Sequence, residues 1–241
     1  MTQLLKAELL KLRTTRTFLA LVATALVLSL ALTILLASLV DAQSGQDVSE
    51  ILLTDTSALF ILVLATVGMT GEWRHRTITG TMLAAPDRAR VLLAKVAVYA
   101  LAGVILSLVV GVVCMVVGSA ILSSRGQVTL DAGDLASLLW RNLAIAAYSG
   151  AIGVLIGALV RNQAAAIVGL LVWVFLIEPT VLAAAADVGR FGPLIGAPGG
   201  FITFEEDPDL LSRFPAFLVM LAWLGGLGAA AAALLRKRDL T

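Results

Sequence analysis

The amino-acid sequence predicts an all-α membrane protein with six transmembrane helices in a single domain, residues 1–241. Of its residues, 60% are hydrophobic and only 14% are charged, which is far from the composition of an ordinary soluble domain. The apolar residues gather in stretches long enough to cross a bilayer, which takes about 20 residues at a rise of about 1.5 Å each. These stretches are apolar on all sides, whereas helices of a soluble protein would carry a polar face.

The first and last predicted spans are the clearest, because residues 18–40 and 214–235 contain no charged side chain. The four spans between them are also apolar and contain at most one charged residue each: residues 51–70, 92–123, 143–160 and 164–186.

The distribution of Lys and Arg predicts how these spans are oriented. If the N-terminus is cytoplasmic, 13 of the 17 basic residues fall on the cytoplasmic side. The four that do not are Arg125, Arg141, Arg190 and Arg213. Basic residues favour the inner side of a membrane, so both termini are expected to face the cytoplasm from a multi-pass position in the cell (inner) membrane. We expect seven of them to anchor the chain to lipids of the inner leaflet: Lys6, Lys11, Arg13, Arg16, Arg88, Arg90 and Lys95.

Residues 3–16, before the first span, have the pattern of an amphipathic helix on the inner surface. Leu5, Leu9 and Leu12 follow helical spacing, while basic residues between and after them can reach lipid phosphates. A cleaved signal peptide is a poorer interpretation, since the apolar run that follows is longer than the usual signal core of about 7–15 residues.

Two outer segments also carry signals. Asp131 or Asp134 is expected to cap a short interfacial helix that leads to Trp140 and Arg141 at the outer boundary. Residues 187–213 are apolar but interrupted by glycines and prolines. Irregular backbone is tolerated at membrane depth only when protein or a wet cavity surrounds it, so this segment is predicted to be a re-entrant, lid-like outer element before the sixth span.

Glu178 is a candidate pathway or outer-gate residue in the fifth predicted span. A carboxylate at that depth is costly unless it faces protein or water, and the following Pro179 is expected to kink or end the helix. Glu178 could contact substrate, or it could accept hydrogen bonds from the re-entrant element; we favour the second role. In spans three and four, small residues recur every four positions and predict close helix packing: Gly103, Ser107, Gly111, Ser149, Gly153 and Gly157.

The inner loop Gly71–Lys95, between the second and third spans, is rich in polar groups for so apolar a chain. Ile78 and Met82 lie one helical turn apart and would form a small apolar knob, and Pro86 and Asp87 suit the start of the next helix. The loop is either an anchor that obeys the positive-inside rule or a docking surface for a cytoplasmic partner.

Several stretches, taken in order, resemble the type-2 ABC transporter permeases, and in particular the compact kind common in actinobacteria. They are AELLKLRTTRT at residues 7–17, GEWRHRTITGTMLAAPDRARVLLAK at 71–95, GALVRNQAAAIVG at 157–169, Glu178-Pro179, and RKRD at 236–239. The resemblance implies that the N-terminal helix is an elbow helix and that the inner loop between the second and third spans holds a coupling helix. It also implies which residues contact the nucleotide-binding subunit: Glu72, Arg74, Arg76, Thr77, Ile78 and Met82.

A permease of this kind is a non-catalytic subunit, and no phosphate-binding G-x-x-x-x-G-K-[ST] loop is present. ATP and magnesium are therefore expected on a separate ATPase, in two copies, and six spans imply a second permease chain, identical or related. One histidine and one cysteine offer no metal site, and no nucleic-acid partner is expected. The resemblance suggests outward movement of a lipophilic or amphipathic substrate.

Three other functional classes of membrane protein share part of this pattern. An ATP-independent secondary transporter or channel is the main alternative, although proton or ion coupling usually needs more carboxylates within the spans. An intramembrane protease would need paired catalytic groups, and neither Gly-x-Ser-x-Gly nor His-Glu-x-x-His occurs. A sensor or immunity module could share the same architecture.

Overall fold

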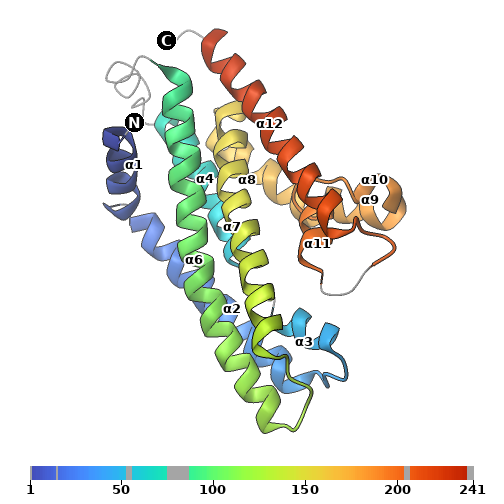
Figure 1. Cartoon of the computed structure of the whole chain (residues 1–241). Coiled ribbons are helices and arrows are strands. Elements are labelled where there is room, and N and C mark those ends of the chain that lie inside the picture. The colour runs from blue at the N-terminus through green and yellow to red at the C-terminus, as the bar shows by residue number, and fades with distance from the viewer. Residues whose placement is uncertain (1, 15, 53–55, 75–86, 204–206, 238–241) are drawn as a thin grey trace.

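The computed structural model describes residues 2–14, 16–52, 56–74, 87–203 and 207–237 (Figure 1). Helices make up nearly all of this part of the chain, and no strand occurs in it. The elements are α1 (Thr2–Thr14), α2 (Arg16–Leu39), α3 (Gly45–Leu52), α4 (Ser57–Arg74), α6 (Arg88–Ser124), α7 (Ala132–Val160), α8 (Gln163–Val172), the π-helical η1 (Trp173–Ile177), α9 (Glu178–Ala184), α10 (Ala186–Gly189), α11 (Gly196–Ile202) and α12 (Arg213–Lys237).

Six helical segments of the described chain are long and apolar enough to cross a membrane, which confirms the predicted all-α fold class. They are Thr17–Leu39, Gly45–Arg74, Arg88–Ser124, Ala132–Val160, Gln163–Ala184 and Arg213–Leu235. The second of these includes α3 as well as α4, so helix begins at Gly45, before the predicted start of the second span at residue 51. The N- and C-terminal helices α1 and α12 end near the same pole of the molecule (Figure 1).

The prediction of a short interfacial helix before the fourth span is wrong. Asp131 does cap a helix, since its side chain accepts a hydrogen bond from the Asp134 amide, but α7 then runs unbroken to Val160. Nothing in residues 132–160 breaks the helical hydrogen-bonding pattern, so the interfacial segment and the span form one rod of 29 residues.

The fifth span is a composite of three helical segments. After α8, the five residues of η1 widen to a π-helix, and α9 begins with Glu178 and Pro179 at its first turn. Proline cannot donate an amide hydrogen bond, and π-turns are one place where a helix absorbs such a defect. The predicted disturbance at Pro179 therefore takes the form of a π-turn just before it.

The core of the bundle consists of α4, α6 and α7, which approach each other closely where glycines replace larger residues. A Cβ built on Gly103 would lie 2.3 Å from the Ala146 carbonyl oxygen, and one on Gly153 would lie 2.4 Å from the Leu62 carbonyl oxygen. The predicted packing role of these two glycines is confirmed. Their contacts fix the helix backbones against one another in the middle of the bundle.

Substituting Gly150 with Ala is expected to destabilise the protein by about 1–3 kcal/mol or more, because the new methyl group cannot be accommodated without moving a helix. Its Cβ would lie 2.3 Å from the backbone oxygen of Tyr99 on α6. Thermal unfolding in mild detergent measures the effect. Gly225→Ala on α12 is the matched control, since no atom lies within 4 Å of the added Cβ; equal effects of the two substitutions would contradict the prediction.

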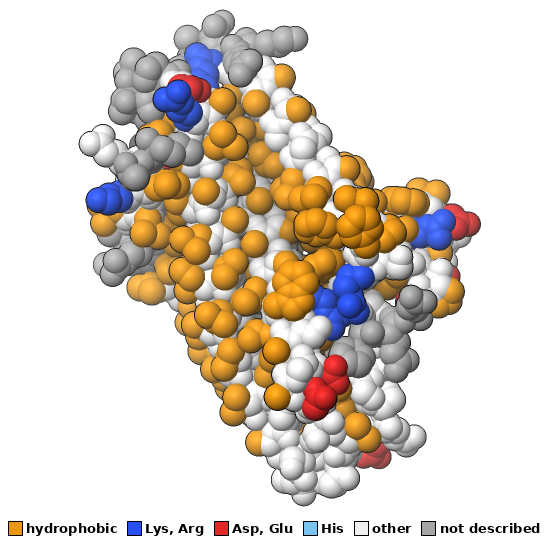
Figure 2. All heavy atoms as spheres, viewed as in Figure 1, with side chains coloured by type: hydrophobic (Ala, Val, Ile, Leu, Met, Phe, Trp, Pro, Cys, Tyr) orange, Lys and Arg blue, Asp and Glu red, His pale blue; other side chains and the backbone are white. Residues whose placement is uncertain are grey.

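The outer helices present their apolar residues to the surroundings. On α6, Leu101, Ile105, Leu108 and Val112 follow helical spacing and are each at least 40% exposed. Figure 2 shows hydrophobic side chains over most of the face formed by the long helices. Such a surface is stable in lipid and would aggregate in water, so the exposed stripe agrees with a chain that spans the bilayer.

Candidate functional site

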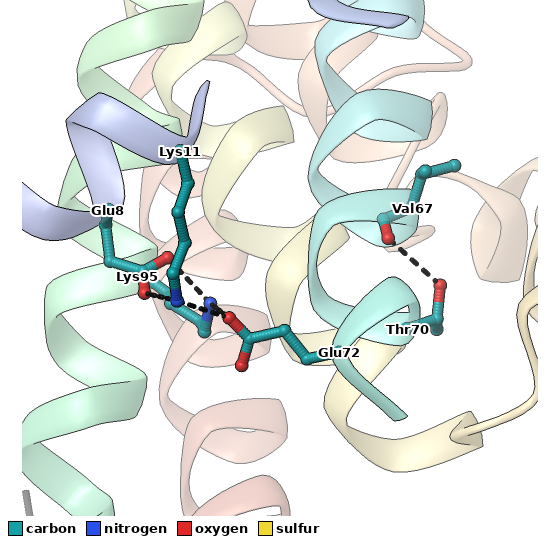
Figure 3. Close-up of polar contacts among 6 residues, drawn as sticks. All are labelled: Glu8, Lys11, Val67, Thr70, Glu72 and Lys95. Atoms are coloured by element: carbon teal, nitrogen blue, oxygen red, sulfur yellow. Dashed lines mark hydrogen bonds and ion pairs between the residues drawn. The ribbon is translucent and has the colours of Figure 1, made fainter. Parts of the chain in front are cut away.

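Four charged side chains from three helices meet at one end of the bundle (Figure 3). The sequence predicts that this end faces the cytoplasm, and we refer to it as the inner end. Lys95 on α6 places its Nζ 2.6 Å from Glu8 Oε2 and 2.7 Å from Glu72 Oε1. Lys11 on α1 places its Nζ 2.8 Å from Glu8 Oε1 and 2.8 Å from Glu72 Oε1. We refer to these four residues as the inner charge cluster.

The inner charge cluster is largely removed from solvent. Lys95 is 1% exposed, Glu8 is 6% exposed and Glu72 is 7% exposed, whereas the Lys11 side chain is 48% exposed. Burying a charge is costly unless it is paired and hydrogen-bonded. Here two lysines face two glutamates, so the formal charges cancel and each buried group has at least one oppositely charged partner.

The cluster joins the two helices that flank the inner loop. Glu72 lies in the last turn of α4, which ends at Arg74, and Lys95 lies about two turns into α6, which begins at Arg88. Glu8 and Lys11 attach α1 to the same point. The inner ends of α1, α4 and α6 are therefore tied together immediately next to residues 75–86.

A cavity of about 590 Å³ lies against the cluster, between α1, α2, α4 and α6. Besides the four residues of the cluster, its wall includes Arg74, Phe18, Leu64 and Tyr99. Among the residues that the structure describes, no three His, Cys, Asp or Glu side chains converge as metal ligands would.

The ionisation of the two α1 residues is tuned by the cluster. Burial acts to raise the pKa of Glu8, but the charge of Lys95 and hydrogen bonds from Lys11 and Lys95 outweigh it and leave the pKa below its ordinary value of 4.5. Burial acts to lower the pKa of Lys11, but hydrogen bonds to Glu72 and Glu8 outweigh it, so this pKa lies above 10.5.

These shifts predict a pH dependence of stability. A carboxyl whose pKa is lowered on folding stabilises the protein above 4.5 and loses that contribution as the pH falls through the lowered value; the raised pKa of Lys11 gives the opposite loss above 10.5. The difference in unfolding temperature between the natural protein and the Glu8→Gln variant should be largest near neutral pH and shrink toward zero in acid. A difference that stays constant with pH would show that the Glu8 charge does not stabilise the fold.

The structure describes only two of the six predicted ATPase contacts. Glu72 turns into the inner charge cluster, while Arg74 is exposed and donates to Gln163 Oε1 at 3.3 Å. The other four lie outside the described residues: Arg76, Thr77, Ile78 and Met82.

Lys95 is not an anchor to lipid headgroups, contrary to the sequence-based interpretation. Its position early in α6 suggested a side chain that reaches back to the leaflet, but the ammonium group points inward to two glutamates. Lys11 also turns toward these carboxylates. The signal that was missed is Glu8, an acidic residue on the same helical face as Leu5 and Leu12, which predicts a basic partner inside the bundle.

The other predicted anchors differ in their surroundings. Lys6 is exposed on α1, and Arg90 is exposed and paired with Asp87 at 2.9 Å. Arg88 is half-buried and donates to the carbonyl oxygen of Leu235 on α12. Arg13 lies in the last turn of α1 and Arg16 begins α2, but their side chains are outside the described part of the chain.

Glu178 holds the predicted re-entrant element, which agrees with the role we favoured from the sequence. Its carboxylate is 3% exposed and accepts hydrogen bonds from the backbone amides of Leu194, Ile195 and Gly196, at 2.7–3.2 Å, and from the indole of Trp173 at 2.8 Å. Gly192 permits this approach, because a Cβ there would lie 2.1 Å from Glu178 Oε1.

Arg141 secures the other end of that element. The sequence placed Arg141 at the outer boundary beside Trp140, but Arg141 is 1% exposed and donates to the carbonyl oxygens of Ile202 and Thr203 at 2.9 and 3.0 Å. Only Trp140, 54% exposed, fits a boundary residue. A carboxylate at the start of α11 and a guanidinium at its end both complement the helix dipole.

Comparison with known proteins gives one assignment. No curated protein matches the chain. A family model described as an ABC-2 family transporter protein matches residues 4–178, which is well over half of the chain. The match begins within α1, includes the whole inner charge cluster and ends at Glu178, and it confirms the resemblance stated from the sequence. The protein is a multi-pass membrane protein that belongs to the ABC-2 transporter family, whose members are the membrane subunits of ABC transporters.

Proposed function

We propose that this permease moves a lipophilic or amphipathic substrate outward, with energy from ATP that a separate nucleotide-binding subunit hydrolyses. The observation that carries the proposal is the inner charge cluster, which ties α1, α4 and α6 together beside the loop expected to meet that subunit. A force applied to this loop would act on three helices at once.

The working unit in this proposal contains two permease chains and two ATPase subunits, in the cell (inner) membrane with both termini cytoplasmic. Closure of the paired ATPases on ATP and magnesium would push on residues 71–95. Because packed helices move as near-rigid bodies, the movement would pass along α4 and α6 into the bundle and open a path past the outer element held by Glu178 and Arg141.

A substitution at Arg76 can test docking to the ATPase subunit without removing a residue of the inner charge cluster. Glu72 is buried in the cluster, so its replacement would disturb the fold as well as any contact. Arg76→Glu, in contrast, reverses a charge in the inner loop, and Arg90→Glu makes the same change at an exposed position of the inner end of α6.

The test is affinity purification of the tagged chain from its native host in mild detergent, followed by mass spectrometry and an ATPase assay. We expect a stoichiometric ATP-binding-cassette subunit with the natural chain and with Arg90→Glu, and its loss with Arg76→Glu at an unchanged unfolding temperature. A homogeneous oligomer with no ATPase partner would overturn the proposal in favour of an ATP-independent secondary transporter or channel.

A further inference from the structure

Two arginines line a cavity of about 610 Å³ at the inner ends of α4 and α7. Its wall consists of Trp73 and Arg74 at the end of α4 and of the turn from Val160 to Ala164 that leads into α8. None of the described residues in this wall is acidic, although the inner charge cluster contains two glutamates nearby. The cavity therefore carries net positive charge at the end of the bundle that the sequence predicts to be cytoplasmic, and anionic lipids are concentrated in the cytoplasmic leaflet.

The arginines are held in place by local structure. Arg161 adopts a positive φ of 57°, which is uncommon for a residue with a side chain, and its guanidinium lies 4.2 Å from the centre of the Trp73 ring. Arg74 is positioned by its hydrogen bond to Gln163. The half-buried Trp73 that carries Arg161 belongs to the same wall.

An apolar cavity of about 260 Å³ adjoins this basic one, and Val160 lines both. It lies between α7, α8 and α12, and its wall includes Leu170, Trp173, Trp223 and Leu227. From Ala165 to Trp173 the cavity follows α8 for about 12 Å. That length is close to the thickness of one leaflet, about half of a hydrocarbon core of roughly 30 Å.

We propose that the two cavities together bind one anionic amphiphile of the inner leaflet, a lipid with a phosphate headgroup. The exposed guanidinium of Arg74 binds the phosphate through charge-assisted hydrogen bonds, and the positive charge of Arg161 in the same wall strengthens the attraction. The apolar cavity takes a hydrocarbon chain, and the start of α8 contributes the positive end of its dipole. The proposal rests on the proposed export function and narrows its substrate to an anionic lipid. Binding of this lipid to the permease does not require the ATPase.

The arrangement of the two cavities distinguishes a lipid from other anions. A free phosphate or an acidic segment of a partner subunit would use the arginines but would leave the apolar cavity without a role. A zwitterionic lipid would fill the apolar cavity but would gain less from two arginines. Only an anionic amphiphile uses both cavities, because its charged headgroup is joined to a hydrocarbon chain just as the basic cavity adjoins the apolar one.

Tryptophan fluorescence can test binding directly, because two of the four tryptophans line the apolar cavity. The full chain, with Trp140→Phe to remove the outer tryptophan, is reconstituted without ATPase in phosphatidylcholine bilayers. A small share of phosphatidylglycerol or of phosphatidylcholine, brominated on the acyl chain, serves as quencher. We expect the brominated anionic lipid to quench at about tenfold lower content than the zwitterionic one.

Variants and competitors decide the source of the effect. Arg74→Gln and Arg161→Gln should each abolish most of the preference. Arg90→Gln should retain it, because Arg90 lines neither cavity and its charge is already paired with Asp87. Arg74 is exposed, so its replacement tests the site even if Arg161→Gln fails to fold. Equal quenching by both lipids, or full competition by soluble glycerol phosphate, would overturn the lipid site. Because no ATPase is present, these results are independent of whether transport is ATP-driven.

Discussion

Replacing Lys95 with Met is expected to destabilise the protein by about 3–5 kcal/mol, the usual cost of removing one partner from a buried ion pair. Lys95 is the most deeply buried member of the inner charge cluster, and it bonds both glutamates at 2.6 and 2.7 Å. Without it, two carboxylates remain inside the bundle with a single, half-exposed lysine between them. Thermal unfolding in mild detergent measures the loss.

A compensating variant separates charge balance from side-chain volume. Combining Lys95→Met with Glu72→Gln restores equal numbers of positive and negative charges in the cluster and should recover part of the lost stability. Lys6→Met, at an exposed position of α1, should leave stability nearly unchanged. If Lys95→Met and Lys6→Met behave alike, the cluster does not stabilise the bundle and its role in our coupling proposal fails.

Replacing Glu178 with Ala is expected to release the outer element and destabilise the protein by about 3–5 kcal/mol. Four donors lose their acceptor at once: the amides of residues 194–196 and the indole of Trp173. Each buried donor left without a partner costs about 1–3 kcal/mol, although such costs are not additive. The rate of amide hydrogen exchange should increase most at these three amides.

Glu178→Gln should cost less, because the amide carbonyl can still accept some of these bonds. Asp187→Ala is the matched control, since it removes a carboxylate from the same outer element at an exposed site. Unchanged hydrogen exchange in Glu178→Ala, together with lost transport, would instead assign Glu178 to the substrate path.

The spans were predictable from sequence because a bilayer imposes one simple requirement, a continuous apolar run. The inner charge cluster was not, because charged residues near a helix end have two stable environments, lipid phosphate or a partner in the protein. Position along the chain does not distinguish them. Lys95 was therefore assigned to the leaflet, while the acidic Glu8 on the apolar face of α1 was the one local sign of the alternative.

The outer element was also predictable from the sequence only in part. Glycines and prolines in residues 187–213 predicted irregular backbone, and irregular backbone at depth requires acceptors and donors from elsewhere in the protein. That requirement singled out Glu178, the lone carboxylate of the fifth span. Arg141 was missed because its neighbour Trp140 has the features of a boundary residue, and only the three-dimensional course of the chain brings the carbonyls of Ile202 and Thr203 to it.

The length of α6 has a mechanical consequence. Its 37 residues form a rod of about 55 Å, which bears against the backbone of α7 at Tyr99 and, about one turn further along, at Gly103. The contact at Gly103 lies about 12 Å from Lys95 and about 33 Å from Arg125, which is paired with Asp41 at the outer end. If α6 rotated about Gly103, its two ends would move in opposite directions, and Arg125 would move nearly three times as far as Lys95. A shift of about 1 Å at the cluster would thus become about 3 Å at Arg125.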